Sequence, residues 1–536
     1  MASTTLVRPT DSTLRQALRL AVIFAVVKLA FQFALTLWTE HLGYGYFRDE
    51  FYYIACGRHL AWGYVDHGPI VAVQARLGEM LFGDSLFSIR IFSAGAAAAA
   101  AVFLTGVIAW ALGGGRPAQA LAMFGLIVCP QYIGADGFLS MNSFEPAFWM
   151  TCVLAVVLML RGHSQRLWWL ILGVSAGLGL LNKPSMVFFL VAVGLGLLVT
   201  PQRRALASRW APAGIGLMIL IALPNVLWQI QNHWPTIEFL RNGQRGHKNI
   251  VLNPVQFFLA QLGNMQPVNA LLWIPGVAAL LRAKSIRDGR WLGLTFLFFF
   301  AIMLAMHAKD YYLAPIYPAY FAAGGIAWEH HFAASRGVRE NRIVAFPVFE
   351  AVLLVTSLII LPMSSPVLRP DAWVGYTTAL HLHGNKTETS ATGPLPQFYA
   401  DRFGWQQEVS IVLHTFQLLS AQDQRRVCIF GSNYGEAGAI DFLAPRQAAG
   451  QHLHLPPALS GHNNYWLWGT HDCDPDLVIA VIGDTPEAVS QKYRSVDIVG
   501  RRDNPWAMPF EDKNIYLLRG RRPSAPFNWA DERFYF

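Results

Sequence analysis

The sequence is short of charge. Only 14% of its 536 residues are charged and 54% are hydrophobic, whereas soluble domains usually carry about 25% charged residues. The apolar residues also gather in runs of about 17 to 25, the length that a helix needs to cross roughly 30 Å of hydrocarbon. Few charges and many long apolar runs exclude an ordinary soluble protein and predict an integral membrane protein that crosses the bilayer many times.

Cysteine is also scarce, and so are the common catalytic motifs. The five cysteines form no Cys-x-x-Cys pair and no Cys/His cluster, so neither a zinc site nor a disulfide framework is predicted. A single Cys428–Cys473 disulfide stays open for a periplasmic C-terminal third. There is no phosphate-binding glycine loop, dinucleotide fingerprint or Gly-x-Ser-x-Gly elbow. A nucleotide-driven enzyme is therefore disfavoured, no cofactor is predicted to be required, and the need for a divalent metal is left open.

The formal charge of +8 raises the question of nucleic-acid binding. Residues 1–362 contain 26 Lys and Arg against 15 Asp and Glu, whereas residues 363–536 contain 15 against 18. The basic excess thus lies between the apolar runs, which is typical of positive-inside topology. No nucleic-acid partner is predicted.

Eleven apolar runs are candidate transmembrane helices, so the predicted fold is an α-helical polytopic membrane protein. With a cytoplasmic N-terminus, every short basic loop falls on the cytoplasmic side. The odd number of spans then places the C-terminal domain in the periplasm, beyond the inner membrane of a bacterium. The candidate spans are 18–38, 88–113, 117–134, 144–160, 167–181, 185–200, 211–230, 268–282, 291–306, 311–328 and 343–362.

The predicted domains are a transmembrane domain over 1–362, with long periplasmic loops at 39–87 and 231–267, and a soluble domain over 363–536. The soluble part contains the strand-like runs Val427-Cys-Ile-Phe and Leu477-Val-Ile-Ala-Val-Ile. Each is followed by a glycine-containing turn and a helix-like stretch, a pattern that predicts a small α/β domain.

Two acidic motifs lie in the first outer loop. Asp49-Glu50 follows the first span among several tyrosines, where a carboxylate can accept a proton from a hydroxyl nucleophile. The alternative is that one of the two caps a helix beginning near Phe51. In Asp66-His67-Gly-Pro, a tight turn could bring both side chains toward a phosphate or sugar, although turn chemistry alone explains Asp, Gly and Pro.

The next outer turn contains Asp136, Asn142 and Glu145, and Glu145 next to Pro146 would also suit the first turn of a helix. Outer-face cations are Lys183 and Lys309, which suit an anionic lipid phosphate unless they simply snorkel at the interface. Outer carboxylates together with outer cations suggest a reaction between a hydroxyl acceptor and a lipid phosphate.

Five motifs occur in one order over residues 1–330, and with them the sequence resembles the GT-C glycosyltransferases. The resemblance is to the bacterial glycosyltransferase family 39 group, related to protein O-mannosyltransferases and to the aminoarabinose transferases of lipid A. The motifs are Phe47-Arg-Asp-Glu-Phe-Tyr-Tyr, Asp66-His-Gly-Pro, Ser140-Met-Asn-Ser-Phe-Glu-Pro, Leu180-Leu-Asn-Lys-Pro-Ser and Lys309-Asp-Tyr-Tyr-Leu-Ala-Pro-Ile-Tyr-Pro-Ala.

The resemblance implies inverting transfer of one sugar from a polyprenyl-phosphate donor to a hydroxyl of a lipid, glycan or protein. Asp49 would be the general base and Glu50 would complete the pair, while cations stabilise the leaving phosphate. Where relatives commonly have Asp in the second outer loop, this chain has Asn142, which leaves the second acid open. The alternatives are that Glu145 takes its place, that Asn142 hydrogen-bonds the acceptor, or that Asp136 is the relevant carboxylate. The residues predicted to bind substrate are Asp66, His67, Asp136, Asn142, Glu145, Lys183, Arg241, Arg245, Lys309, Tyr311 and Tyr312.

Two other classes of protein would share the many spans. A polyprenyl-lipid or small-molecule transporter would carry charges near the bilayer midplane and internal repeats, whereas here the charges lie at one face and no repeat is visible. A non-catalytic partner in a glycosylation complex would tolerate loss of Asp49. The sugar, the acceptor and the oligomeric state are not predicted.

Overall fold

The computed structural model describes residues 11–536 except 283–285, 287, 335–338, 383, 385, 387, 451 and 452. Parts of the basic loops at 282–290 and 336–342 therefore lie outside the described residues. Contacts divide the chain into two compact units that do not follow chain order. The helical unit contains Met1–Trp38, Arg90–Pro224 and Val251–Val367, and the mixed unit contains Thr39–Ile89, Asn225–Ile250 and Leu368–Phe536.

Among the described residues, five helices are long and apolar enough to cross a membrane. They are Thr13–His41, Leu86–Ala111, Met141–Leu160, Ala211–Gln231 and Phe346–Ser364, and shorter apolar helices cover Ser185–Leu198, Pro267–Leu281 and Arg290–Ala305. A multi-span membrane protein is thus confirmed, while the number of eleven spans stays a prediction.

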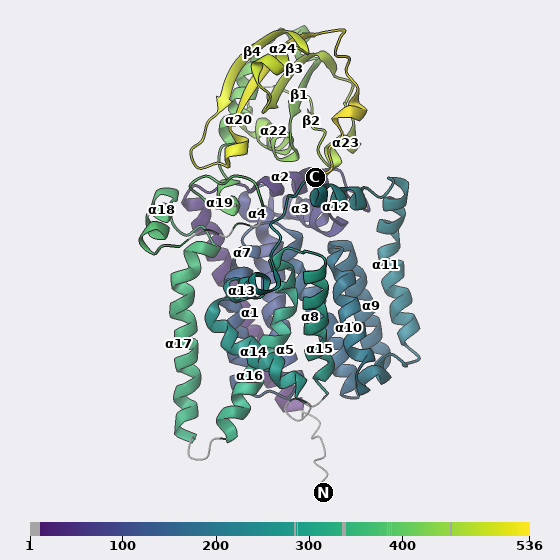
Figure 1. Cartoon of the computed structure of the whole chain (residues 1–536), viewed down its shortest axis with the longest axis vertical. Coiled ribbons are helices and arrows are strands. Elements are labelled where there is room, and N and C mark those ends of the chain that lie inside the picture. The colour runs from purple at the N-terminus through teal and green to yellow at the C-terminus, as the bar shows by residue number, and fades with distance from the viewer. Residues whose placement is uncertain are drawn as a thin grey trace. The chain divides into compact units, whose positions relative to one another are not determined.

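A helix nevertheless lies at each of the eleven predicted positions (Figure 1). Proline shortens two of them. The run 117–134 is divided because Cys129 is extended and Pro130 begins a new helix, and the run 311–328 begins as a 3-10 turn that contains Pro315. The elements are α1 (Asp11–His41), η1 (Ile91–Ala97), α5 (Ala98–Ala111), α6 (Arg116–Ile127), α7 (Pro130–Ala135), α8 (Met141–Leu160), α9 (Gln165–Asn182), α10 (Ser185–Leu198), η2 (Pro201–Ala205), α11 (Ala211–Gln231), α13 (Pro254–Asn264), η3 (Pro267–Asn269), α14 (Ala270–Leu281), α15 (Arg290–Ala305), η4 (Asp310–Ile316), α16 (Tyr317–Ala334) and α17 (Arg339–Ser364).

Small residues bring the central helices of the helical unit into close contact. A Cβ at Gly276 of α14 would lie 2.2 Å from the Tyr320 carbonyl oxygen, and one at Gly324 of α16 would lie 2.0 Å from that of Leu272. Glycine at both positions lets the two backbones touch, as is common between membrane helices.

The mixed unit contains a five-stranded sheet in the order β2-β1-β3-β5-β4. β1 is parallel to β2 and β3, whereas β5 is antiparallel to β3 and β4. Both predicted strands, in β1 and β3, are confirmed. The elements are α2 (Arg48–Arg58), α3 (Pro69–Phe82), α4 (Leu86–Arg90), α12 (Pro235–Arg245), α18 (Pro370–Ala379), α19 (Gln397–Ala400), α20 (Trp405–Gln417), α21 (Ala421–Gln424), β1 (Val427–Gly431), α22 (Tyr434–Gln447), β2 (Ala458–Leu459), α23 (Asn464–Trp468), β3 (Asp474–Ile482), α24 (Pro486–Ser490), β4 (Tyr493–Arg502), η5 (Pro509–Glu511), β5 (Lys513–Arg521) and η6 (Trp529–Glu532).

Helix α2, from the first outer loop, packs on α22 of the C-terminal third. A Cβ at Gly438 would lie 3.0 Å from the Phe51 backbone, and one at Gly435 would lie 2.3 Å from the Arg48 side chain. Phe51 also meets Trp405 edge to face at 5.5 Å. The loop and the tail therefore form one packed body within the mixed unit.

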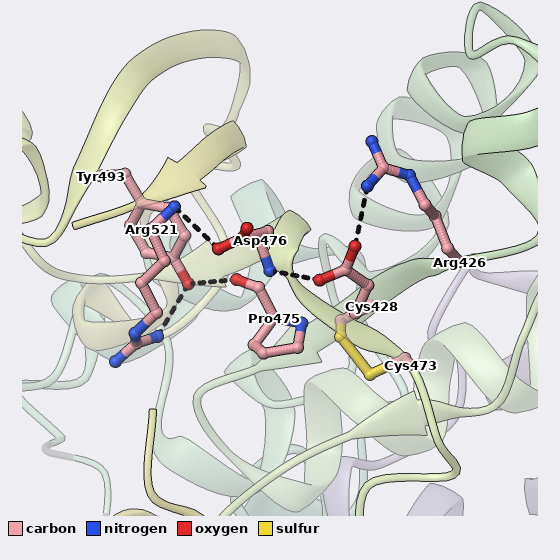
Figure 2. The surroundings of a disulfide bond; sticks show 8 residues. Arg426, Cys428, Cys473, Pro475, Asp476, Tyr493 and Arg521 are labelled. Atoms are coloured by element: carbon pink, nitrogen blue, oxygen red, sulfur yellow. Dashed lines mark hydrogen bonds and ion pairs between the residues drawn. A yellow bond between two sulfur atoms is a disulfide. The ribbon is translucent and has the colours of Figure 1, made fainter. Parts of the chain in front are cut away.

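A disulfide joins Cys428 of β1 to Cys473, just before β3, and closes a loop with a sequence separation of 45 (Figure 2). Next to it, the Tyr493 hydroxyl donates to the Pro475 carbonyl oxygen at 3.3 Å and accepts from Arg521 at 2.9 Å. Figure 2 shows these side chains beside the disulfide. The disulfide therefore links β1 to the start of β3, its parallel neighbour in the sheet.

Replacing both Cys428 and Cys473 with serine should destabilise the sheet by about 2 to 4 kcal/mol, because the unfolded loop gains conformational freedom. Protease sensitivity of the C-terminal third during thermal melting measures this change, and the Cys56→Ser variant is the control for loss of a free thiol. If wild-type Cys428 reacts with a maleimide in denaturant without a reductant, the disulfide is absent.

Candidate functional site

Asp49 and Glu50 lie in the first turn of α2 and have different surroundings. Phe47 precedes the helix in extended conformation, and the buried Glu50 carboxylate accepts its backbone N–H at 2.8 Å. Glu50 thus makes the helix-capping interaction that the sequence left open. Asp49 points elsewhere, and its side chain keeps 27% of its accessible surface.

One oxygen of Asp49 is held by a tyrosine from the C-terminal third. The Tyr434 hydroxyl donates to Asp49 Oδ1 at 2.8 Å, and Arg48 Nε lies 3.5 Å from the same oxygen. Oδ2 makes no hydrogen bond or ion pair within the described part of the chain. Burial raises the pKa of Tyr434 well above its usual value of 10.0, and the Asp49 charge raises it further, so the hydroxyl remains a donor.

Asp66 and His67 lie in the mixed unit with Asp49, within a cage of aromatic rings. Asp66 accepts the Tyr52 hydroxyl at 2.8 Å, and the buried His67 ring stacks on Tyr64 with centroids 4.6 Å apart. Burial raises the pKa of the Asp66 carboxyl and lowers the pKa of His67. The same burial effect therefore favours the uncharged form of both groups.

The helical unit brings together six of the predicted substrate-binding residues around Lys183, which caps the C-terminal end of α9. Lys183 Nζ lies 2.7 Å from Asn142 Oδ1 and 3.1 Å from Glu145 Oε2. It also lies 4.2 Å from the centre of the Tyr312 ring, and Ser185 donates to the other oxygen of Glu145. The Lys183 cluster consists of Asn142, Glu145, Lys183, Ser185, Lys309, Tyr311 and Tyr312, with Lys309 Nζ 6.0 Å from the Tyr311 ring.

Three other predicted residues lie apart from these two groups. Asp136 forms a buried ion pair with Lys28 of α1 at 3.0 Å, which accounts for its charge inside the helical unit. Arg241 and Arg245 lie on α12 with exposed side chains and form no ion pair among the residues that the structure describes.

Sequence reasoning did not identify Lys28, Ser185 or Tyr434 as site residues. A lysine within the first apolar run is a signal for Lys28, since a charge there requires a partner. Tyr434 carries no local signal, because nothing in the sequence pattern links it with Asp49. Among the described residues, no group of three or more His, Cys, Asp or Glu could hold a metal ion.

The comparisons with known proteins begin with a family model. Residues 66–228 match the family model described as dolichyl-phosphate-mannose-protein mannosyltransferase. Together with the fold, this match confirms the resemblance to family 39 glycosyltransferases that the ordered motifs predict.

Particular relatives are similar to the chain to different extents. The structure of ArnT from Cupriavidus metallidurans bound to undecaprenyl phosphate has a TM-score of 0.58 at 14% identity and covers 94% of this chain and 99% of that chain. The apo structure of the same protein has a TM-score of 0.54 at 16% identity, with 92% and 97% covered. At these identities the likeness concerns the fold alone.

Among curated proteins, the lipid A galacturonosyltransferase RgtD of Rhizobium johnstonii (strain DSM 114642 / LMG 32736 / 3841) is 25% identical over 255 residues. The match covers 45% of this chain and 50% of that protein. The chain therefore aligns with about half the length of this relative.

Asp401, a buried acid near Asp49, allows the effect of burial on a carboxyl pKa to be tested. Its Oδ2 lies 3.9 Å from Arg48 Nη2, and burial raises its pKa to about 7, although Arg48 opposes the shift. Aspartates of an unfolded chain titrate near 3.9. Between pH 8 and 6 the folded state therefore takes up a proton that the unfolded state does not, and stability rises as the pH falls.

We expect the melting temperature of the mixed unit to be a few degrees higher at pH 6 than at pH 8. Asp401→Asn should reduce this rise. Part of it should remain in that variant, because Glu408 is still present and burial raises its pKa to about 8. The control is Asp423→Asn, because hydrogen bonds from Arg426 lower the pKa of that carboxyl and leave it ionised over this range. An unchanged rise in Asp401→Asn would contradict the assignment.

Proposed function

We propose that this protein transfers a single sugar, with inversion, from a polyprenyl-phosphate donor to a hydroxyl group of a lipid, glycan or protein. The reaction takes place at the periplasmic face of a bacterial inner membrane. The observation that carries the proposal is Asp49, a partly exposed carboxylate whose Oδ1 is held by Tyr434 at 2.8 Å. Its Oδ2 is left to accept a proton.

In the proposed reaction, Asp49 Oδ2 takes the proton of the acceptor hydroxyl while the hydroxyl oxygen attacks the anomeric carbon of the sugar. The new carbon–oxygen bond forms as the bond from the anomeric carbon to the phosphate oxygen breaks. The electron pair of the broken bond leaves with the polyprenyl phosphate. Asp49 ends the step protonated and the leaving phosphate carries the negative charge.

Within the helical unit, the Lys183 cluster is suited to bind a lipid phosphate. Lys183 and Lys309 are cations next to tyrosine rings, and an ammonium group can donate several hydrogen bonds to phosphate oxygens. Asn142 and Glu145 accept two of the Lys183 donors and so hold it in place. In this proposal Glu145 positions the lysine. Asn142 also accepts a hydrogen bond from Lys183 but is neutral, so it adds no second negative charge near the phosphate.

The likeness of the fold to that of ArnT bound to undecaprenyl phosphate supports a polyprenyl phosphate as the carrier. The disulfide supports a periplasmic C-terminal third, because disulfides persist in oxidising compartments. Alkylation in intact cells tests this location. If the tail faces the cytoplasm, Cys428 and Cys473 will be found reduced.

Asp49→Asn should lower the rate of sugar transfer by about 1,000-fold or more, because an amide cannot accept the proton. The assay mixes a panel of labelled undecaprenyl-phosphate sugars with purified protein and an envelope fraction of the source cells. The control is Asp84→Asn, an exposed carboxylate of the same loop that pairs with Arg446, and it should retain full activity.

Full transfer by a folded Asp49→Asn variant would exclude this base. Failure of the wild-type protein to transfer any sugar of the panel, together with transport of labelled polyprenyl phosphate across liposomes, would favour a transporter instead.

Lys183→Met should weaken binding of undecaprenyl phosphate by about 10- to 100-fold, as expected for loss of a hydrogen bond to a charged group. Binding is measured by native mass spectrometry or by a thermal-shift titration with the lipid. Arg166→Met is the matched control, since Arg166 is an exposed cation at the other end of α9, 5.2 Å from the Trp210 ring. Equal affinity of the Lys183→Met and wild-type proteins would refute the phosphate role.

A further inference from the structure

We propose that Tyr434 is a positioning residue for Asp49, so that the C-terminal α/β part of the chain takes part in the chemistry. The inference rests on the proposed function of Asp49 as general base. It adds a residue that lies 385 positions away in the sequence and outside the region matched by the family model.

The Tyr434 ring is held on both faces. It stacks on Tyr52 with centroids 4.5 Å apart and an interplanar angle of 23°, and on His462 at 4.4 Å and 28°. The Arg48 guanidinium lies 5.7 Å from the ring centre. Because the ring cannot swing away from between its two neighbours, the hydroxyl has a fixed direction, and that direction is Asp49 Oδ1.

His462 is itself fixed in one tautomer by its partners. Its Nε2 lies 2.9 Å from the Phe536 carbonyl oxygen, and its Nδ1 lies 3.5 Å from the Tyr434 backbone nitrogen. A neutral ring that donates from Nε2 and accepts at Nδ1 satisfies both contacts. Burial lowers the pKa of His462 to about 3, so the stack on Tyr434 carries no extra positive charge near neutral pH.

The backbone of Tyr434 is fixed by the end of β1 and the start of α22. Asn433 caps α22 by accepting the N–H groups of Gly435 and Glu436 at 2.8 and 3.2 Å. Glu436 completes the capping box by accepting the Asn433 N–H at 3.1 Å. Tyr434 thus occupies the first position of a capped helix, at the carboxyl end of a parallel strand, where ligand crevices of α/β sheets form.

The second partner, Asp49, is held against Tyr434 by the packing of α2 on α22. At Gly435 and Gly438 the helices are so close that a Cβ would clash with Arg48 and Phe51. A shift of α2 would therefore break its packing against α22. The hydrogen bond from the Phe47 backbone N–H to the Glu50 carboxylate also fixes the first turn of α2. Both ends of the Asp49–Tyr434 hydrogen bond are therefore anchored independently of any substrate.

The hydrogen bond from Tyr434 decides which oxygen of Asp49 can act as the base. A base must present a free oxygen to the acceptor hydroxyl at hydrogen-bond distance. By occupying Oδ1, Tyr434 fixes the carboxylate rotamer and leaves Oδ2 as the acceptor of the proton. Loss of the hydroxyl should therefore lower kcat and leave the KM for the sugar donor unchanged, because the phosphate is bound by other residues.

The test is Tyr434→Phe, which removes the hydroxyl and keeps the stacked ring. We expect kcat to fall about 10- to 100-fold, the range for one hydrogen bond to a charged group, with donor KM and undecaprenyl-phosphate affinity within about twofold of wild type. The matched control is Tyr465→Phe. Tyr465 is a buried tyrosine of the same unit whose hydroxyl donates to Asp441 at 2.9 Å, and its loss should leave kcat unchanged.

Two further measurements separate positioning from general damage. The melting temperatures of Tyr434→Phe and Tyr465→Phe should be similar, and rates are compared at the same interval below each melting temperature. In an Asp49→Glu background, where the longer side chain moves the carboxylate off the tyrosine, the Tyr434→Phe change should have less than a twofold effect on kcat. If that background has no measurable rate, the comparison with Tyr465→Phe decides.

Full kcat in Tyr434→Phe, or an equal loss in Tyr465→Phe, would overturn the proposal. If Asp49→Asn is inactive while Tyr434→Phe is fully active, only the role of Tyr434 fails. If Asp49→Asn is fully active, the proposed base fails, and the role of Tyr434 fails with it.

Discussion

The close packing of α2 on α22 is the constraint on which the mixed unit depends. Because Gly435 and Gly438 have no side chains, the first outer loop lies directly against α22, the helix that follows β1. This contact makes one body from segments that are far apart in the chain. It also explains why loop 39–87, predicted as part of the transmembrane domain, packs against the C-terminal third with Asp49 at a defined place.

The second constraint is the cost of burying charge. Several buried ions among the described residues have a partner of opposite sign, since an isolated charge in a low-dielectric interior is expensive. Lys28 pairs with Asp136 in the helical unit, and Arg502 pairs with Glu408 and Glu511 at 2.9 and 3.1 Å in the mixed unit. The Lys183–Glu145 pair follows the same rule. Asp49 differs from these pairs, because its side chain is partly exposed and its Oδ2 keeps no hydrogen bond or ion pair among the described residues.

Prediction from the sequence succeeded where the signal is local. Apolar runs located a helix at each expected position, and the β-branched runs around Val427 and Leu477 located two strands of the sheet. Asn142 and Glu145 of one outer motif and Lys183 of another were identified as polar outer-face residues, and the structure joins these three side chains. The choice between catalysis and capping for Glu50 could not be made from the sequence, because both uses require an acid at the same position of the same helix.

The sequence by itself determined the membrane class, the positions of the helices and the candidate acids and cations, because hydropathy, period and turn chemistry act over a few residues. Only the tertiary structure decided which of these residues meet. The Asp49–Tyr434 hydrogen bond, the Lys28–Asp136 ion pair and the Cys428–Cys473 disulfide all join segments that no local pattern relates. Such pairings follow from how whole faces pack and from the requirement that buried polar groups find partners, and those conditions exist only in the folded chain.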